Sequence, residues 1–336
     1  MPTMHDVARL AGVSQSTVSR VLNNSADVIL NPKTIERVLE AANELGYRID
    51  PLARALKGKS TGVIGIITRR YDSFLPQLVS ELSLNFRQAG YMIIHGEANN
   101  NPDEVFNLHT LFETQFCDGL ILAADPKGLD TTQTQNIFQD KHLVMTAWGV
   151  PVRGIPLVNT NNQAGIEMAL THLFELGHQR IAFLDVGWAG DHRVRRQTYQ
   201  DMMEDAGLFY PPHLVTSDEG IQAGFEATQA LLALNPRPTA ILASEDLLAF
   251  GALRAAYHNN ISVPDQLSII GFDDLPFAEF SIPALTTIRQ PIEEIAQIIC
   301  DLLINLIRET ATQADDDITL VKPQLIIRET TTVPCL

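Results

Sequence analysis

Apolar residues in the first 47 positions recur at helical spacing in three short segments. The first segment follows an i, i+3, i+4, i+7 pattern that stops at Gly12, which predicts a short helix with one apolar face. The third segment follows Pro32 and ends at Gly46, a suitable residue for the end of a helix. The apolar positions are Met4, Val7, Ala8 and Ala11 in the first segment and Ile35, Val38, Leu39, Ala42 and Leu45 in the third.

The second segment differs because one of its sides is wholly polar. Ser14 is suited to cap its N-terminus, and Val18, Val21 and Leu22 form its apolar side. A short helix, a tight turn with a glycine and a second helix with a polar outer face form the helix-turn-helix pattern of DNA-binding domains. A three-helix cap domain is the alternative, but Arg20 is the residue type best suited to read guanine. The polar side consists of Gln15, Ser16, Ser19, Arg20 and Asn23.

From Gly62 onward, continuous apolar runs alternate with amphipathic helical patterns. This alternation predicts an α/β fold of parallel sheets covered on both faces. A break near residues 158–162 begins a second series of such units, which predicts two doubly wound lobes with a ligand-binding cleft between them. The strand patterns lie at 63–67, 91–96, 119–124, 143–148, 180–185, 239–244 and 267–272, and the helical patterns at 75–89, 163–176, 195–206, 220–234 and 247–259.

A short basic stretch, residues 48–60, separates the two patterns. Pro51 suits the first position of a helix and Gly58 its end, but a helix this short is marginal in water and should order only when something holds it. The sequence therefore predicts three parts. They are a helix-turn-helix headpiece at 1–47, a hinge at 48–60, and a core at 61–336 with one lobe at about 61–158 plus 291–318 and the other at about 161–288 plus 319–332.

The charge is divided unevenly between these parts. The 336 residues carry a net charge of −16, which by itself argues against nucleic-acid binding. Residues 1–60, however, hold eight Lys and Arg against six Asp and Glu, whereas residues 61–336 hold sixteen against thirty-four. Only the headpiece is therefore suited to approach phosphate. No apolar run approaches the length of a membrane span and the N-terminal stretch lacks an export signal, so we expect a cytoplasmic protein with no membrane partner.

Neither a catalytic nor a metal-binding pattern occurs in the sequence. The three cysteines, Cys117, Cys300 and Cys335, are far apart and show no zinc-ligand spacing. The string LKGKST resembles the end of a phosphate-binding loop, but Ala53 stands where its first glycine belongs. We therefore expect no enzyme activity and no cofactor. A periplasmic-type small-molecule binding protein without a DNA role is the alternative function.

Ordered motifs along the whole chain make the resemblance to one family specific. HDVARLAGVSQSTVSRVLN, ERVLEAANELGY and PLARALK in the first 57 residues resemble the lactose/galactose repressor (LacI/GalR) family. The match continues through HLFELGHQRIAFL, PTAILASEDLLAFGAL, VPDQLSIIGFDD and PALTTIRQP. The resemblance implies a transcription regulator with a periplasmic-binding-protein-like core. We expect it to be a repressor of carbohydrate-metabolism genes.

The family resemblance also implies which residues contact DNA. The second helix would enter the major groove, with some residues nearer to phosphate than to base edges. The hinge would fold in the minor groove, where Leu56 matches an apolar wedge between base pairs. Gln15, Ser16 and Arg20 match the base-reading positions, Ser14, Thr17 and Ser19 the phosphate-side positions, and Arg54 and Lys57 flank the wedge.

The same resemblance implies a small effector, usually a sugar, bound between the lobes. Carboxylates and arginine supply acceptors and donors for hydroxyl groups, and aromatic rings supply flat faces for a sugar ring. Effector binding would change the closure of the lobes and so the spacing of two hinges in a homodimer on a near-palindromic operator. The matching positions are Phe74, Trp148, Arg195, Glu219, Glu245, Asp273 and Gln290.

Several positions depart from the family pattern. The loop NSADVILNPK is about two residues longer than usual, and Ile35 replaces a common arginine, which puts phosphate contacts there in doubt. Asn161 stands at a position where members of the family often have an aspartate. Glu219 and Glu245 make the expected pocket more acidic, so we hypothesise a polyhydroxyl or amine-bearing ligand rather than a carboxylate or phosphate.

The expected oligomer is a dimer, because the sequence shows no leucine-heptad tail. The helices near 75–89 and 247–259 are the expected dimer contacts.

Overall fold

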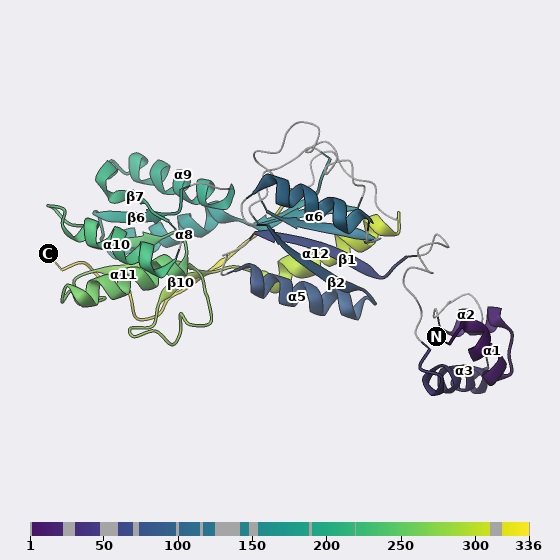
Figure 1. Cartoon of the computed structure of the whole chain (residues 1–336). Coiled ribbons are helices and arrows are strands. Elements are labelled where there is room, and N and C mark those ends of the chain that lie inside the picture. The colour runs from purple at the N-terminus through teal and green to yellow at the C-terminus, as the bar shows by residue number, and fades with distance from the viewer. Residues whose placement is uncertain are drawn as a thin grey trace. The chain divides into compact units, whose positions relative to one another are not determined.

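The structure is a computed structural model, and it divides into two compact units, Met1–Gly62 and Val63–Leu336, which we describe separately (Figure 1). Asn23, Arg54, Leu56, Lys57, Trp148 and Glu219 lie outside the described residues, as does the expected hinge except for Ser60. The structure describes residues 2–22, 31–47, 60–69, 74–98, 101–114, 117–124, 142–147, 154–187, 190–218, 220–309 and 318–335.

The described residues of the first unit form three helices around a small apolar core, as the spacing predicts. They are α1 (Met4–Ala11), α2 (Gln15–Leu22) and α3 (Pro32–Glu44). Thr3 and Asp6 form a capping pair at the start of α1, because each side chain accepts the backbone N–H of the other residue. Gly12 ends α1 with φ 63°, a conformation that favours glycine. The central side chains, Val7, Val18 and Val38, are fully buried.

Two predicted core positions of α3 are wrong. Ile35 is 37% exposed and Leu39 is 50% exposed, whereas Ala41 and Ala42 are buried beside Val38. Leu39 follows Val38 by one residue, which turns its side chain about 100° away from the buried stripe. Ile35 lies in the first turn of α3, one turn before the buried stripe begins. Helix α3 therefore contributes Val38 and two small alanines, Ala41 and Ala42, to the core, and not the larger Ile35 and Leu39.

The first lobe of the second unit contains a six-stranded parallel sheet in the order β11-β5-β4-β3-β1-β2. Helices α5 (Leu75–Gln88) and α12 (Ile292–Ile307) pack on one face, and α6 (Pro102–Thr114) packs on the other (Figure 1). The strands are β1 (Val63–Arg69), β2 (Met92–Ala98), β3 (Gly119–Ala123), β4 (Leu143–Thr146), β5 (Leu157–Thr160) and β11 (Ile318–Val321).

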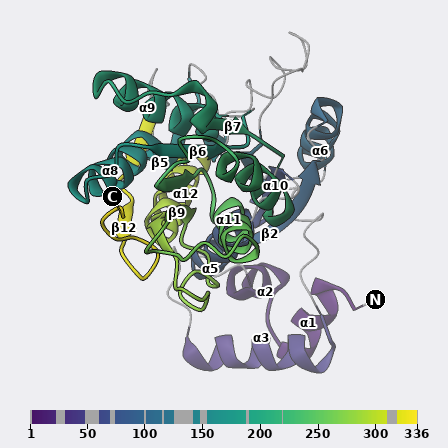
Figure 2. The same ribbon diagram turned by 90° about the vertical axis from the view of Figure 1, so that its left-hand side faces the viewer.

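The second lobe repeats this arrangement with the order β12-β10-β9-β8-β6-β7. All neighbours are parallel except β12, which is antiparallel to β10. Helices α8 (Asn162–Glu175) and α9 (Gly190–Asp205) cover one face, and α10 (Ile221–Leu232) and α11 (Asp246–His258) cover the other (Figure 2). The strands are β6 (Ile181–Asp185), β7 (Leu214–Thr216), preceded by the short helix η1 (Pro211–His213), β8 (Ala240–Ala243), β9 (Ser268–Asp273), β10 (Thr286–Arg289) and β12 (Gln324–Ile326).

The chain passes between the lobes at three places, from β5 to α8, from β10 to α12 and from β11 to β12. Two of these crossings touch, because Asn161 N–H donates to the Val321 carbonyl at 2.8 Å. The last crossing lies beyond Val321, a few residues later than the boundary after residue 318 that the sequence suggested. The α/β fold with two doubly wound lobes is confirmed, and it brings the carboxyl ends of the strands of each lobe toward a shared region.

Candidate functional site

Helix α2 presents a polar surface built on a single buried valine. Val18 faces the core, while Gln15, Ser16 and Arg20 are exposed. Ser14 organises the start of the helix, because its Oγ accepts the Thr17 N–H at 3.1 Å. Its hydroxyl also lies 2.7 Å from Ser16 Oγ and 2.8 Å from Thr17 Oγ1.

The hydroxyl groups of Ser16 and Thr17 bond to that of Ser14 at the start of α2. The long exposed side chains of α2 are Gln15 and Arg20. Gln and Arg each offer paired hydrogen-bonding groups of the kind that read base edges in a DNA groove. The short hydroxyl groups at the N-terminus of a helix suit phosphate, which the helix dipole also favours. The arrangement therefore has the chemistry of a helix that reads DNA. The predicted groups on α2, Ser14, Gln15, Ser16, Thr17, Ser19 and Arg20, all lie within this helix or at its cap.

A second site lies at the strand ends between the two lobes. Five of the predicted ligand residues, contributed by both lobes, line one cavity there. The space they enclose is about 20 Å³, which is close to what a single water needs, so a sugar enters only if side chains or lobes move. The lining residues are Phe74, Ala147, Asp191, His192, Arg195, Glu245, Asp273 and Gln290.

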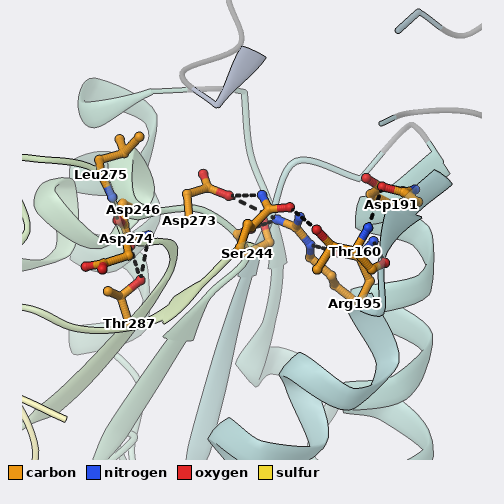
Figure 3. Close-up of polar contacts among 12 residues, drawn as sticks. Thr160, Asp191, Arg195, Ser244, Asp246, Asp273, Asp274, Leu275 and Thr287 are labelled. Atoms are coloured by element: carbon orange, nitrogen blue, oxygen red, sulfur yellow. Dashed lines mark hydrogen bonds and ion pairs between the residues drawn. The ribbon is translucent and has the colours of Figure 1, made fainter. Parts of the chain in front are cut away.

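Arg195 lines this cavity and is only 4% exposed. Figure 3 shows its side chain beside Ser244. It extends from α9 and donates from Nε to Asn162 Oδ1 at 2.7 Å and from Nη1 to the Ser244 carbonyl at 2.5 Å. Its guanidinium carbon lies 3.6 Å from the centre of the Phe272 ring. These contacts fix the plane of the guanidinium group, which is the condition for recognising hydroxyl groups in one orientation.

Asp273 and Gln290 continue the polar network toward the first lobe. Gln290 Nε2 donates to Asp273 Oδ1 at 2.6 Å, and Arg195 Nη1 lies 3.9 Å from the same oxygen. The Thr160 hydroxyl of β5 in turn donates to Gln290 Oε1 at 2.6 Å. Because Gln290 accepts from Thr160, its amide group must present N–H to Asp273. The Gln290 side chain thus connects Asp273 to Thr160, which lies 130 positions before Gln290 in the sequence.

Sequence reasoning missed Asp191 and His192, which lie four and three residues before Arg195 on α9. Helical spacing places i, i+3 and i+4 on one face, so Arg195 itself was the signal that would have found them. Burial, followed by the charges of Arg195 and Arg69, holds the pKa of His192 well below its ordinary value of 6.5. The imidazole is therefore neutral at neutral pH. Ala147, also missed, directly follows β4 and has φ 34°.

Asp191 also ties the two lobes together. The Asn159 amide on β5 donates to Asp191 Oδ1 at 2.7 Å, and both side chains are buried. Glu245, on the opposite side of the cavity, accepts the Gly220 N–H at 3.2 Å. The described wall of the cavity therefore carries three carboxylates and one guanidinium. Such a wall favours a ligand with several hydroxyl groups over an anionic one.

Two larger hollows lie beside this cavity and are weaker candidates. One, of about 410 Å³, lies against β11 and the starts of α8 and α9, and one, of about 530 Å³, lies between α8 and α9. Their polar side chains are largely engaged with one another, as in the bond from Gln163 to Glu167 and that from Gln197 to Asp201. They offer few convergent groups to a ligand.

The described part of the chain gives no sign of a metal centre or of a membrane segment. No group of three or more His, Cys, Asp or Glu side chains there is placed to hold a metal ion. No helix there has both the length and the apolar character needed to cross a bilayer.

Comparison with known proteins matches both units. Residues 3–50 match the family "bacterial regulatory proteins, lacI family", and residues 170–331 match a periplasmic binding protein-like domain. Among solved structures, the lac repressor dimer bound to operator and the anti-inducer ONPF has a TM-score of 0.85 and 27% identity, covering 98% of this chain and 99% of that one. A transcriptional regulator CelR in complex with cellobiose has a TM-score of 0.71 and 26% identity, covering 98% of this chain and 100% of that one.

Two curated relatives match over nearly the full length. The HTH-type transcriptional regulator GalS of Salmonella typhimurium is 35% identical over 311 residues, which is 90% of this chain and 89% of that protein. The ribose operon repressor of Escherichia coli K12 is 34% identical over 320 residues, which is 93% of this chain and 95% of that protein. Taken with the helix-turn-helix unit and the two-lobed core, these matches show that the chain belongs to the lacI family of bacterial regulatory proteins.

Proposed function

We propose that this regulator is a repressor that binds a near-palindromic operator as a homodimer and responds to a sugar-like effector held in the cavity between its lobes. The observation that carries the proposal is the convergence of Phe74, Arg195, Glu245, Asp273 and Gln290 from both lobes on one cavity. The relatives whose names state a role are transcriptional repressors or regulators, so we propose no catalytic role. Since its target is genomic DNA, its proposed location is the cytoplasm.

The DNA-reading part of the proposal depends on α2. Gln15, Ser16 and Arg20 are the base-reading groups, and Ser14, Thr17 and Ser19 position the helix on the phosphate backbone. A twofold protein reads a twofold site, so two headpieces occupy two half-sites. The hinge residues Arg54, Leu56 and Lys57 keep the roles proposed from the family resemblance, and Asn23 is proposed as a further DNA contact because it belongs to the polar side of the second segment.

An exposed apolar patch on the second lobe supports the homodimer. Phe277, Phe280 and Ile282 lie on the turn between β9 and β10 and are 71%, 75% and 97% exposed. Large apolar side chains that are exposed together in one short segment favour a protein contact there. The partner that a symmetric assembly supplies is a second copy of the chain.

The ligand class follows from the cavity wall. Asp191, Glu245 and Asp273 accept hydrogen bonds from hydroxyl groups, Arg195 and Gln290 donate them, and Phe74 offers an aromatic face. Three carboxylates against one guanidinium disfavour a phosphorylated sugar. Trp148 and Glu219 complete the proposed ligand set.

The test is a binding assay with a fluorescent duplex from the region upstream of the chain's own gene. The protein should bind this duplex more tightly than a scrambled duplex of equal length, and salt should weaken both complexes. One sugar of a panel including D-ribose, D-galactose and cellobiose should change the affinity for the specific duplex. D-ribose 5-phosphate should act more weakly than D-ribose. Equal binding to both duplexes, or a response to no sugar and no other polyhydroxyl compound, would contradict the proposal.

A further inference from the structure

The loop that carries Asp273 into the cavity has an unusual backbone. Asp273, the last residue of β9, has φ 125°, and Asp274 after it has φ 55°. Two successive residues that are not glycine rarely adopt left-handed conformations, and they remain there only where surrounding contacts enforce them. The position of the Asp273 carboxylate in the cavity therefore depends on what anchors this loop.

Asp246 anchors the loop from the side away from the cavity (Figure 3). It is the first residue of α11 and is fully buried. Its Oδ2 accepts the N–H of Leu275 at 2.7 Å, and its Oδ1 accepts the Thr287 hydroxyl. Thr287 Oγ1 also lies 3.4 Å from the Asp274 backbone nitrogen. The carboxylate thus holds the residue that directly follows the two left-handed positions.

The space for this carboxylate is provided by a glycine on the neighbouring strand. A Cβ at Gly271 would lie 2.1 Å from Asp246 Oδ1, so a side chain there would displace the anchor. The carboxylate, the strand β9 and the loop after it therefore form one packed unit.

A second contact turns Asp274 away from the ligand. Its carboxylate pairs with Arg289 Nε at 2.6 Å and with Arg328 Nη2 at 2.7 Å. Asp274 is therefore paired with two arginines and does not line the cavity. Asp273 lines the cavity and accepts a hydrogen bond from the Gln290 amide. Glu245 and Asp246 show the same division, because Glu245 lines the cavity and Asp246 lies beneath the loop.

We propose that Asp246 is a positioning residue for effector recognition, which holds the loop 273–275 so that Asp273 faces the ligand while Asp246 itself never touches it. This inference rests on the proposed effector function of the cavity. Nothing in the cavity wall itself shows this role, because the hydrogen bonds of the Asp246 carboxylate go to the loop and to β10.

The anchor is sensitive to protonation. The pKa of Asp246 is raised to about 7, because burial, and to a smaller extent the neighbouring Asp274, outweighs the lowering by the Thr287 and Leu275 hydrogen bonds and by Arg328. Only the ionised carboxylate accepts both the Leu275 N–H and the Thr287 hydroxyl without offering a competing proton. Ligand affinity should therefore fall as the pH decreases through about 7.

The variant Asp246→Asn separates this role from general structure. The amide keeps the shape of the side chain but carries no charge and has one acceptor oxygen instead of two. The sugar concentration that gives half-maximal change in operator binding should rise about tenfold, the equivalent of one hydrogen bond to a charged group. Between about pH 6 and about pH 8 the parent's half-maximal concentration should decrease, whereas that of the variant should stay level. Operator affinity without sugar should be unchanged.

Asp265→Asn is the matched control, because Asp265 is an exposed aspartate of the same lobe. It should behave as the parent at every pH. Thr287→Val is a second variant that removes one donor to the carboxylate, and it should produce a smaller loss of the same kind. If Asp246→Asn matches the parent in sugar response and in pH profile, the positioning role is overturned.

Amide hydrogen exchange tests the anchor without any ligand. The Leu275 N–H should exchange faster in Asp246→Asn than in Asp265→Asn, and equal exchange would overturn the proposal. If the parent binds operator but answers to no sugar, the effector function fails. The exchange measurement still decides whether Asp246 holds the loop.

Discussion

Replacing Arg195 with methionine tests the centre of the cavity. The unbranched methionine side chain keeps an apolar contact with the Phe272 ring but removes every donor of the guanidinium group. Asn162 Oδ1 and the Ser244 carbonyl then lose the donor that now serves them. Asp273 retains the Gln290 amide but loses its nearby cation.

The magnitude follows from these contacts. Each hydrogen bond from a charged donor contributes about 1.5–3 kcal/mol, and removing one member of a buried charged network costs about 3–5 kcal/mol. A protein of this kind has roughly 5–15 kcal/mol of stability, so the variant should fold but melt at a lower temperature. If the ligand loses one charged donor of the same strength, its affinity should fall about tenfold to about 100-fold.

The assay is operator binding followed by fluorescence anisotropy as the sugar is titrated. Arg195→Met should bind operator as the parent does but should need far more sugar for the same change. Arg196→Met is the control, because Arg196 is the next residue of α9, pairs with Asp185 and Thr216, and does not line the cavity. A parent-like sugar response in Arg195→Met, or an equal loss in Arg196→Met, would refute the assignment of the cavity.

Three further outcomes follow from the other features. Arg20→Ala should cost about 1–3 kcal/mol of specific operator binding, while binding to a scrambled duplex, measured in the same titration, should change little. Phe280→Glu combined with Ile282→Glu should give monomers in analytical ultracentrifugation, and an intact dimer would exclude this patch as the contact. His192 is neutral in the folded state and takes up a proton on unfolding below about pH 6.5. The stability of the parent relative to His192→Gln should therefore decrease as the pH falls through that value, by at most about 1.4 kcal/mol per pH unit in urea denaturation, and a pH-independent difference would contradict the burial of a neutral imidazole.

The regular elements could be predicted because their signals are local. The alternation of apolar runs with amphipathic segments indicated both lobes, and the apolar spacing that stops at Gly12 indicated α1. Burial was harder to predict. Ile35 and Leu39 are large and apolar and still exposed, because the face of a helix that packs depends on neighbours that the periodicity of one helix does not describe.

The cavity was predictable only in part, for a related reason. Asp273 stands in the motif VPDQLSIIGFDD and Arg195 matches a ligand position of the family, and the structure places Arg195 Nη1 3.9 Å from Asp273 Oδ1. The bond between Thr160 and Gln290 has no local signal, because it joins residues on two separate crossings between the lobes. Asp246, in turn, has the sequence context of an ordinary acidic residue in the first turn of a helix, and nothing local indicates that it is buried beneath a ligand-binding loop.

The contacts between the lobes define how large an effect a ligand can exert. Asn159 donates to Asp191 and Thr160 donates to Gln290, and both acceptors also line the cavity. A ligand that draws Asp191 and Gln290 to its own hydroxyl groups replaces two bonds between the lobes. The bond to the neutral amide is worth about 1 kcal/mol and the bond to the carboxylate about 1.5–3 kcal/mol. Since a ligand shifts an equilibrium only by its differential affinity, these two bonds allow a shift of about 2.5–4 kcal/mol, or about 70-fold to about 900-fold. The lower part of that range coincides with the roughly 1–3 kcal/mol that couples sites in allosteric proteins, so these two bonds are strong enough to make occupancy of the cavity affect the lobes.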